Sequence, residues 1–170
     1  MFAAARRQHG LVTTTQLLVA GWDKDAIARR VASGYLRRLH HGVYLVGPLV
    51  AEHTAAMAAV LATGGVISHY PAVVLWDWRP PREGPVHVIA GGRNHADLIV
   101  HHTALDPRDI TRRHGIPVTS AARTLLDLAA TEPTAELERP LNEAGLQRRV
   151  SLIPSMSSSA VTRTTQERQH

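Results

Sequence analysis

The chain has 170 residues, of which 44% are hydrophobic and 19% charged, and its formal net charge is +5. This length and composition are typical of a globular protein with one domain or two small ones, and they exclude a wholly disordered chain. The chain has no cysteine, which excludes disulfides, thiolate zinc sites and thiol nucleophiles.

No apolar run approaches the roughly 18 residues that a membrane-spanning helix needs. The N-terminus also lacks the features of a secretory signal. We therefore expect a cytoplasmic protein that does not enter a membrane.

The positive charge is concentrated at the N-terminus. Residues 1–47 hold seven cationic side chains and two acidic ones, whereas residues 48–170 hold twelve of each sign. The net charge of +5 therefore belongs to one short segment, and a compact cationic unit of this kind favours a polyanionic partner such as DNA. Lys24 is the only lysine, which weighs against restriction-type nuclease sites that place a lysine beside carboxylates.

Two short helices are predicted first. Residues 1–9 are rich in alanine and arginine and end at Gly10, which is typical of a helix stop. Thr13, Thr14 and Thr15 offer hydroxyl groups that can cap a second short helix. Gly21 closes that helix.

A third helix is predicted from Lys24 to Ser33, with Asp23 as its N-cap and Gly34 after its end. Ile27 and Val31 lie four residues apart, so we expect them to form its buried stripe.

Residues 35–46 alternate in a way that predicts a β-hairpin around His40, His41 and Gly42. Two helices followed by a hairpin form a winged helix-turn-helix, whose second helix enters the major groove while its wing lies along the phosphate backbone. We expect the helix to contribute Lys24, Arg29 and Arg30 to DNA binding. We expect the wing to contribute Arg37, Arg38, His40 and His41. Two alternatives are a helical subdomain with solvated arginines and a winged helix that binds protein.

Gly47-Pro48 is the predicted boundary between this unit, residues 1–47, and a small α+β domain at residues 48–150. Helices are expected over 51–62, 68–76, 121–130 and 135–146, and extended segments over 86–90, 98–102 and 116–118. The last helix contains Pro140, a residue type that can interrupt a helix. A turn at residues 91–94 would join the first two extended segments as a hairpin. Within 121–130 the spacing of Ala122, Leu125, Leu126 and Ala129 predicts the buried stripe.

Several polar groups in this domain could suggest chemistry. Ser68-His69 has the residue types of a nucleophile and base, but a helix cap and a structural histidine are the better account. His87, His101 and His102 lie on neighbouring predicted strands, so their side chains could meet across a sheet. The sequence offers no cysteine and no positioned carboxylate as a further ligand, and this absence argues against a metal site. We expect no catalytic residues, no metal and no cofactor.

Two further features complete this domain and the chain. Arg123 and Asp127, four residues apart, are expected to form an ion pair on the surface of a helix. Residues 151–170 are rich in serine and threonine and are expected to be a disordered tail.

Several segments resemble AbiEi-type antitoxins, which belong to type IV toxin–antitoxin systems. The similar segments are Gly10–Leu17, Arg29-Arg30-Val31 with Gly34, Leu39–Val46, Ile67–Ala72, Val86–Val88 and Ile116–Asp127. The resemblance implies a winged-helix regulator that binds its own operator DNA and represses its operon. It also implies a second domain with the antitoxin role and a nucleotidyltransferase-like toxin as partner.

The resemblance transfers no catalytic residues. Many relatives continue into an endonuclease-like C-terminal domain, which this sequence lacks. The alternatives are therefore a non-catalytic fragment of such an endonuclease-domain protein and a winged-helix protein-interaction module.

Overall fold

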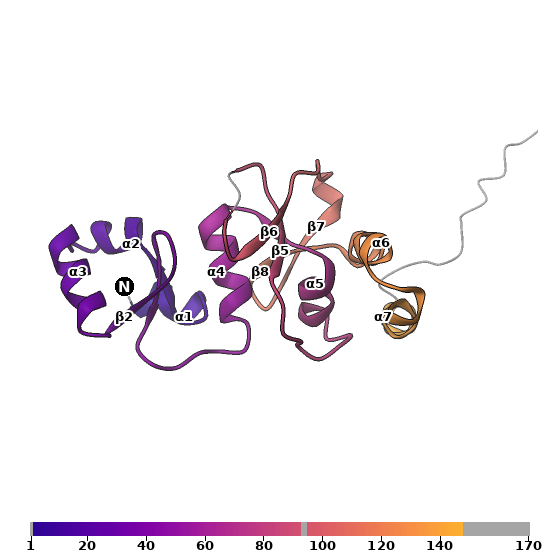
Figure 1. Ribbon diagram of the computed structural model, residues 1–170, viewed down its shortest axis with the longest axis horizontal. Coiled ribbons are helices and arrows are strands. Elements are labelled where there is room, and N and C mark those ends of the chain that lie inside the picture. Colours follow the sequence, from indigo (N-terminus) through magenta and orange to yellow (C-terminus); the bar gives the residue numbers. More distant parts are fainter. Residues whose placement is uncertain (1, 93–94, 148–170) are drawn as a thin grey trace, which may run out of the picture.

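The structure is a computed structural model that describes residues 2–92 and 95–147. Figure 1 shows two units arranged along the long axis of the molecule, each built on its own β-sheet. The expected disordered tail at residues 151–170 lies outside the described residues. Within them, no helix is both long enough and apolar enough to cross a membrane.

The first unit is a winged helix-turn-helix, as predicted. Its elements are α1 (Phe2–Arg7), β1 (Leu11–Thr13), α2 (Thr14–Val19), α3 (Lys24–Ala32), β2 (Leu36–His40) and β3 (Val43–Val46). The three strands form an antiparallel sheet in the order β1-β3-β2. Strand β1 was not predicted, because three residues are too few to show the alternation of a strand, and its conformation depends on pairing with β3.

The predicted helix caps are present in this unit. Thr13 and Gln16 form a capping box at the start of α2, with the Thr13 hydroxyl accepting from the Gln16 backbone N–H at 3.3 Å. Asp23 Oδ1 accepts from the Ala26 backbone N–H at 2.6 Å and begins α3. These bonds satisfy backbone donors that a helix leaves open at its start.

Ile27 is buried at 5% exposure, and its predicted partner Val31 is half-buried. Both pack in a small hydrophobic cluster with Leu17, Leu36 and Tyr44. This cluster fixes the side of α3 that faces inward.

The second unit is an α+β domain, as predicted. Its elements are α4 (Thr54–Thr63), β4 (Val66–Ile67), α5 (His69–Leu75), β5 (Val86–Ile89), β6 (Leu98–His101), the short 3-10 helix η1 (Pro107–Asp109), β7 (Ile110–Arg113), β8 (Ile116–Thr119), α6 (Ala121–Thr131) and α7 (Thr134–Leu146). The sheet is mixed, with strand order β6-β5-β4-β8-β7. Pro140 lies inside α7 without ending it.

The hairpin predicted between β5 and β6 is wrong, because these strands are parallel. Parallel strands require a connection that returns to the same end of the sheet, so a tight hairpin turn cannot join β5 to β6. His87 pairs with Ile99, and His101 lies two residues beyond Ile99. Because side chains alternate between the faces of a sheet, His87 and His101 share one face.

The buried stripe predicted for α6 is also largely wrong. Leu125 is buried, but Leu126 is 69% exposed, and the buried face instead includes Thr124 and Leu128. The Thr124 hydroxyl lies 2.7 Å from the hydroxyl of Thr119, a polar bond that turns this side of the helix inward.

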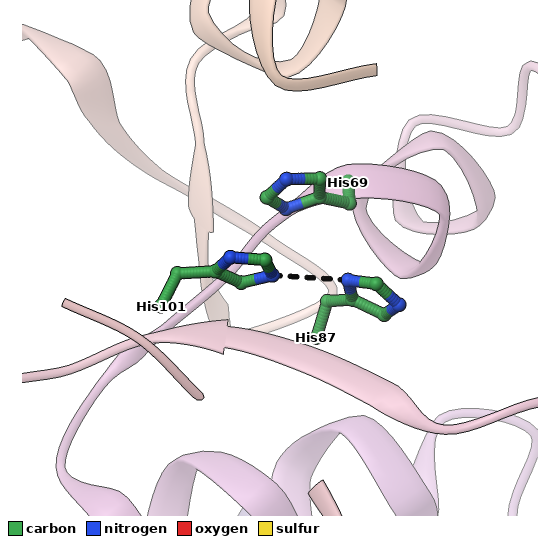
Figure 2. A group of neighbouring side chains, drawn as sticks. All are labelled: His69, His87 and His101. Atoms are coloured by element: carbon green, nitrogen blue, oxygen red, sulfur yellow. Dashed lines mark hydrogen bonds between the residues drawn. The ribbon is translucent and has the colours of Figure 1, made fainter. Parts of the chain in front are cut away.

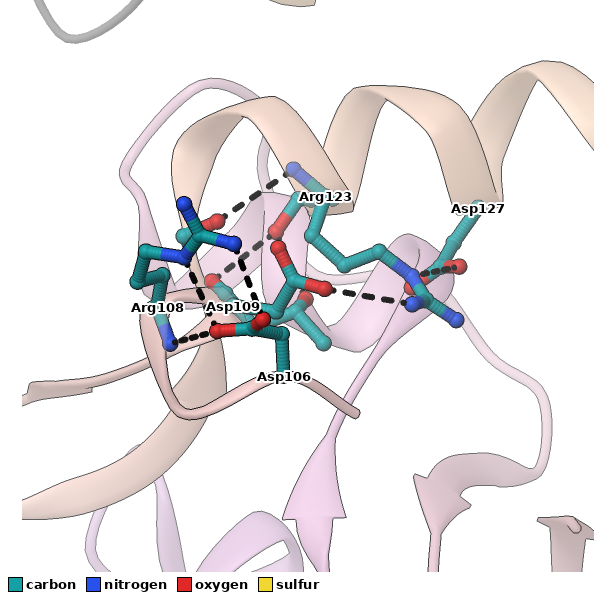
Figure 3. A network of polar contacts seen from close by, with 8 residues as sticks. Asp106, Arg108, Asp109, Arg123 and Asp127 are labelled. Atoms are coloured by element: carbon teal, nitrogen blue, oxygen red, sulfur yellow. Dashed lines mark hydrogen bonds and ion pairs between the residues drawn. The ribbon is translucent and has the colours of Figure 1, made fainter. Parts of the chain in front are cut away.

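The predicted ion pair between Arg123 and Asp127 is confirmed, at 2.7 Å from Nε to Oδ1. Figure 3 shows the Arg123 guanidinium between this carboxylate and that of Asp109, which lies 3.5 Å from Nη1. The pair is largely buried, with 17% of the Arg123 side chain and 9% of the Asp127 side chain exposed.

Ser68 occupies the N-cap position of α5, but its side chain makes no capping hydrogen bond. Its hydroxyl instead lies 2.9 Å from Nδ1 of the neighbouring His69. Ser68 therefore has the predicted N-cap position but not the predicted capping hydrogen bond, because its hydroxyl contacts the imidazole instead of a backbone N–H.

The two units meet through apolar side chains. Leu11, Val43 and Leu45 of the first sheet belong to the same hydrophobic cluster as Met57 and Ala58 of α4. The boundary predicted at Gly47-Pro48 lies between β3 and α4, and the core is continuous across it.

Candidate nucleic-acid interface

Helix α3 turns one face toward the protein and the opposite face toward solvent. Ile27 is buried, whereas Asp25, Ala28, Arg29 and Ala32 are exposed. These four residues are spaced three and four positions apart, so they lie on one face of the helix. In Figure 1 α3 lies at the end of the molecule farthest from α6 and α7. The exposed face is therefore open to a large ligand.

Lys24 and Arg29, two of the predicted DNA-binding residues, are exposed on α3. Within the described residues, neither takes part in an ion pair. Their charges are therefore not neutralised by a neighbouring carboxylate.

Arg30 is placed differently from Arg29. Its guanidinium carbon lies 3.9 Å from the centroid of the Trp22 ring, and Nη1 donates to the backbone carbonyl of Ala26 at 3.4 Å. The residue is half-buried. Stacking of a guanidinium on an indole is a favourable cation–π contact, so this arginine contributes to holding α3 against the preceding loop.

Arg37 and Arg38 lie on β2 and are both exposed. As consecutive strand residues they project from opposite faces of the ribbon. The Arg38 guanidinium lies 5.7 Å from the centroid of the Tyr44 ring on β3. The wing therefore carries one cation on each face.

His40 and His41 also separate. A register shift between Arg38 and His40 interrupts the β2–β3 ladder, and the half-buried His40 ring faces His95 edge-on, with 6.5 Å between the centroids. Burial lowers the pKa of His40, and His95 lowers it further, while Asp97 opposes the shift. His40 therefore contacts the second unit.

His41 is exposed in the hairpin turn. The following residue, Gly42, has φ of 72°, a left-handed conformation that glycine adopts without strain. The Gly42 carbonyl accepts from the Thr14 backbone N–H at 2.9 Å, so the turn is attached to the start of α2.

Sequence reasoning missed Asp25, Ala28 and Ala32 as members of the exposed face. Their spacing of three and four residues around Arg29 predicts a shared helix face, but the positions of the cations alone do not indicate it. It also missed the role of Trp22, which no local pattern ties to Arg30.

Comparison with known proteins agrees with the architecture of the first unit. Residues 1–47 match the family model described as "Transcriptional regulator, AbiEi antitoxin". The search of curated proteins found no match to the chain. The resemblance noted in the sequence is thus supported over the winged helix-turn-helix, residues 1–47, which are similar to the AbiEi antitoxin family of transcriptional regulators.

Proposed function

We propose that residues 1–47 bind double-stranded operator DNA and that the chain acts as a repressor and antitoxin without catalysis of its own. The observation that carries this proposal is the exposed face of α3, where Arg29 stands between two alanines at the far end of the molecule. The local net charge of +5 supplies the attraction to phosphate. The family match is consistent with this reading.

In this proposal α3 lies in the major groove. Ala28 and Ala32 are small, so the helix can approach the base edges closely, and their methyl groups can contact thymine methyl groups. Arg29 reads guanine through two hydrogen bonds, and Asp25 accepts from the amino group of cytosine. The exposed face thus offers one donor group, one acceptor group and two apolar contacts.

The remaining cations position the protein on the backbone. Lys24 in the first turn of α3 and Arg37, Arg38 and His41 of the wing bind phosphate groups, a role that carries no sequence information. Arg30 keeps its stack on Trp22 and positions α3. His40 lies toward the second unit and contributes least to DNA binding.

We assign the antitoxin role to the second unit, residues 48–147. Residues 48–147 hold eight basic and eleven acidic side chains, a net charge of −3, so this part of the chain has no net attraction for a polyanion. A protein partner suits such a surface better than DNA, and the resemblance points to a nucleotidyltransferase-like toxin.

The placement of α3 in the major groove, with Arg29 contacting a base, is tested with Arg29→Ala. A labelled duplex from the region upstream of the coding sequence and a shuffled duplex of equal length are titrated with each variant at several salt concentrations. Arg29→Ala is expected to weaken binding to the upstream duplex by roughly 5- to 150-fold and to reduce the preference over the shuffled duplex. Arg112→Ala, which removes an exposed arginine from the second unit, is the matched control and should leave both affinities unchanged. Equal effects of the two variants would contradict the assignment of α3.

The wing is tested with Arg37→Ala combined with Arg38→Ala. We expect weaker binding to both duplexes by a similar factor, and a salt dependence whose slope is smaller by about 2, because two phosphate contacts are lost. A loss confined to the upstream duplex would instead assign these arginines to base recognition.

The antitoxin role is tested by co-expression with a neighbouring gene that encodes a nucleotidyltransferase-like protein. The chain should suppress growth arrest by that protein and co-purify with it. Arg29→Ala should still suppress the arrest, because the toxin contacts lie in the second unit. Suppression by residues 1–47 alone would overturn this assignment.

A further inference from the structure

Three imidazole rings from three separate elements meet in the second unit. His69 is the first residue of α5, His87 lies on β5 and His101 ends β6. Each ring offers a nitrogen, and these three atoms all lie within 4.8 Å of one another. Figure 2 shows the rings of His87 and His101 facing each other, with His69 beside them. His87 Nδ1 and His101 Nε2 lie 3.1 Å apart, within hydrogen-bond distance.

The surroundings keep these rings in the form that binds metal ions. Burial and the neighbouring imidazoles lower the pKa of His69 to about 4. Burial also lowers the pKa of His87 and His101, and His101 adds to the shift of His87. Each of these shifts favours the neutral imidazole, whose nitrogen is a good ligand for transition metals.

One ring nitrogen of His69 contacts the side chain of the preceding residue. Ser68 is fully buried, and its hydroxyl lies 2.9 Å from Nδ1 of His69. This contact leaves Nε2 as the nitrogen for a ligand, in the way that partners of metal-bound histidines orient the ring. His69 also has φ of 55°, a strained conformation for a residue with a side chain.

A carboxylate beside the cluster supplies an independent sign of a ligand. Asp127 is 8% exposed, and its Oδ1 accepts from Arg123 at 2.7 Å. Its other oxygen, Oδ2, is buried and has no hydrogen-bond partner among the described residues. Asp127, His69 and His101 line the same cavity of about 370 Å³. An unpaired buried carboxylate oxygen is unfavourable, and a metal-bound water in this cavity would give it a donor.

The distances suit a small divalent ion. Zn–N bonds of about 2.0–2.1 Å at tetrahedral angles place ligand nitrogens roughly 3.3 Å apart, close to the separation of the His87 and His101 nitrogens. The rings of His69 and His101 are stacked, with centroids 4.0 Å apart and planes at 15°. The His69 ring would therefore have to turn out of this stack to complete the site.

We propose that His69, His87 and His101 bind a divalent transition-metal ion of the zinc class, with the fourth position open to the cavity lined by Asp127. Such an ion joins α5 to the two parallel strands at the edge of the sheet. A ligand set of three histidines and one open position is also that of zinc sites that bind water or an anion. The site is independent of the proposed DNA-binding surface.

The test is a metal titration of the full-length chain after removal of bound metal with a chelator. Zn²⁺ is titrated in competition with a chromogenic chelator, and Co²⁺ is titrated while its visible absorption is recorded. We expect one ion per chain and a Co²⁺ spectrum of four-coordinate type. His87→Gln and His101→Gln should each weaken binding by at least 100-fold, and Asp127→Asn by roughly 10- to 100-fold.

His102→Gln is the matched control. This histidine follows His101 in the chain, but its Nδ1 lies 3.0 Å from the carbonyl oxygen of Ala90, and it is outside the cluster. The variant should bind metal as the parent does. Circular dichroism identifies any variant that fails to fold. If a variant fails, metal binding is measured instead on the parent chain, by the NMR chemical shifts of its imidazole protons. Shifts of the three cluster histidines on addition of one equivalent of Zn²⁺ support the site. Absence of saturable binding, or stoichiometric binding retained in the His87→Gln, His101→Gln double variant, would overturn it.

Discussion

The two units use their charged side chains in opposite ways. Every ion pair among the described residues lies in the second unit, from Asp77 to Glu136. The first unit has seven cationic side chains and no ion pair within the described part of the chain. The second unit thus neutralises its charges internally, whereas the first leaves its cations available to an external partner.

The apolar core does not follow this division. Leu45 of the first sheet is fully buried in the same cluster as residues of α4 and the second sheet. The difference between the units is therefore a difference of surface, while their stability is shared.

The largest effect is expected from Leu45→Ala. Loss of this fully buried side chain should lower the free energy of unfolding by about 2–5 kcal/mol, measured by urea denaturation. Because its cluster spans both units, far-UV circular dichroism and tryptophan fluorescence should report one common transition. Leu126→Ala, at a position 69% exposed, is the control, with a change within about 0.5 kcal/mol. Two separate transitions in the parent chain would show that the units are energetically independent.

A smaller effect is expected from Arg123→Ala. It removes the hydrogen bond to Asp127 Oδ1 and leaves the carboxylate buried without its cation, which should cost about 1–3 kcal/mol. Burial raises the pKa of Asp127, and Arg123 opposes this shift. The loss should therefore be larger at pH 8 than at pH 5, where the unpaired carboxyl can take up a proton. Arg108→Ala, from the solvent-exposed pair with Asp106, should have little effect at either pH.

Asp23→Ala addresses the first unit. Loss of the N-cap bond to Ala26 should lower the free energy of unfolding by about 1 kcal/mol. Asp25→Ala removes the same charge from the first turn of α3 but no capping bond, so the difference between the two variants isolates the contribution of the cap. Both variants are compared by thermal denaturation at the same ionic strength. Equal destabilisation by the two would contradict the capping role of Asp23.

The smallest effect is a pH dependence at the contact between the units. The His53 ring lies near the rings of His9, in the first unit, and His114, in the second, at centroid distances of 5.9 Å and 4.5 Å. Burial lowers the pKa of His53, His114 and His9 lower it further, and Glu52 and Asp77 oppose the shift. The unfolded chain therefore binds more protons than the folded chain just below pH 6.5, and stability falls as the pH drops through this range.

The measurement is the free energy of unfolding at pH 7.5 and pH 5.5 in the parent and in His53→Gln. The variant should lose less stability on acidification, because one histidine with a lowered pKa is absent. Histidines that do not interact with His53 cancel in the difference, which therefore reports His53 together with its interactions with His9 and His114. An unchanged or larger loss would exclude His53 as a source of the pH dependence.

Local sequence was sufficient for much of the first unit. Asp23, Thr13 and the glycines mark helix ends through bonds that reach only a few residues along the chain, so α2 and α3 could be predicted with their caps. The concentration of positive charge in residues 1–47 follows from counting charged residues in the sequence, so it could be predicted without a structure. The ion pair of Arg123 with Asp127 was equally predictable, because one helical turn brings the two side chains together.

Contacts between distant residues decided the rest. The parallel pairing of β5 with β6 depends on the path of the connecting chain, and it collects His87 and His101 on one face. Sequence reasoning expected His102 as their third member, but the fold brings His69 from α5 instead. The rotation of α6 that exposes Leu126 and the stacking of Arg30 on Trp22 likewise depend on what each element packs against. Caps and charge counts are set within one helical turn, whereas pairing partners and buried faces are set by segments that only the folded chain brings together.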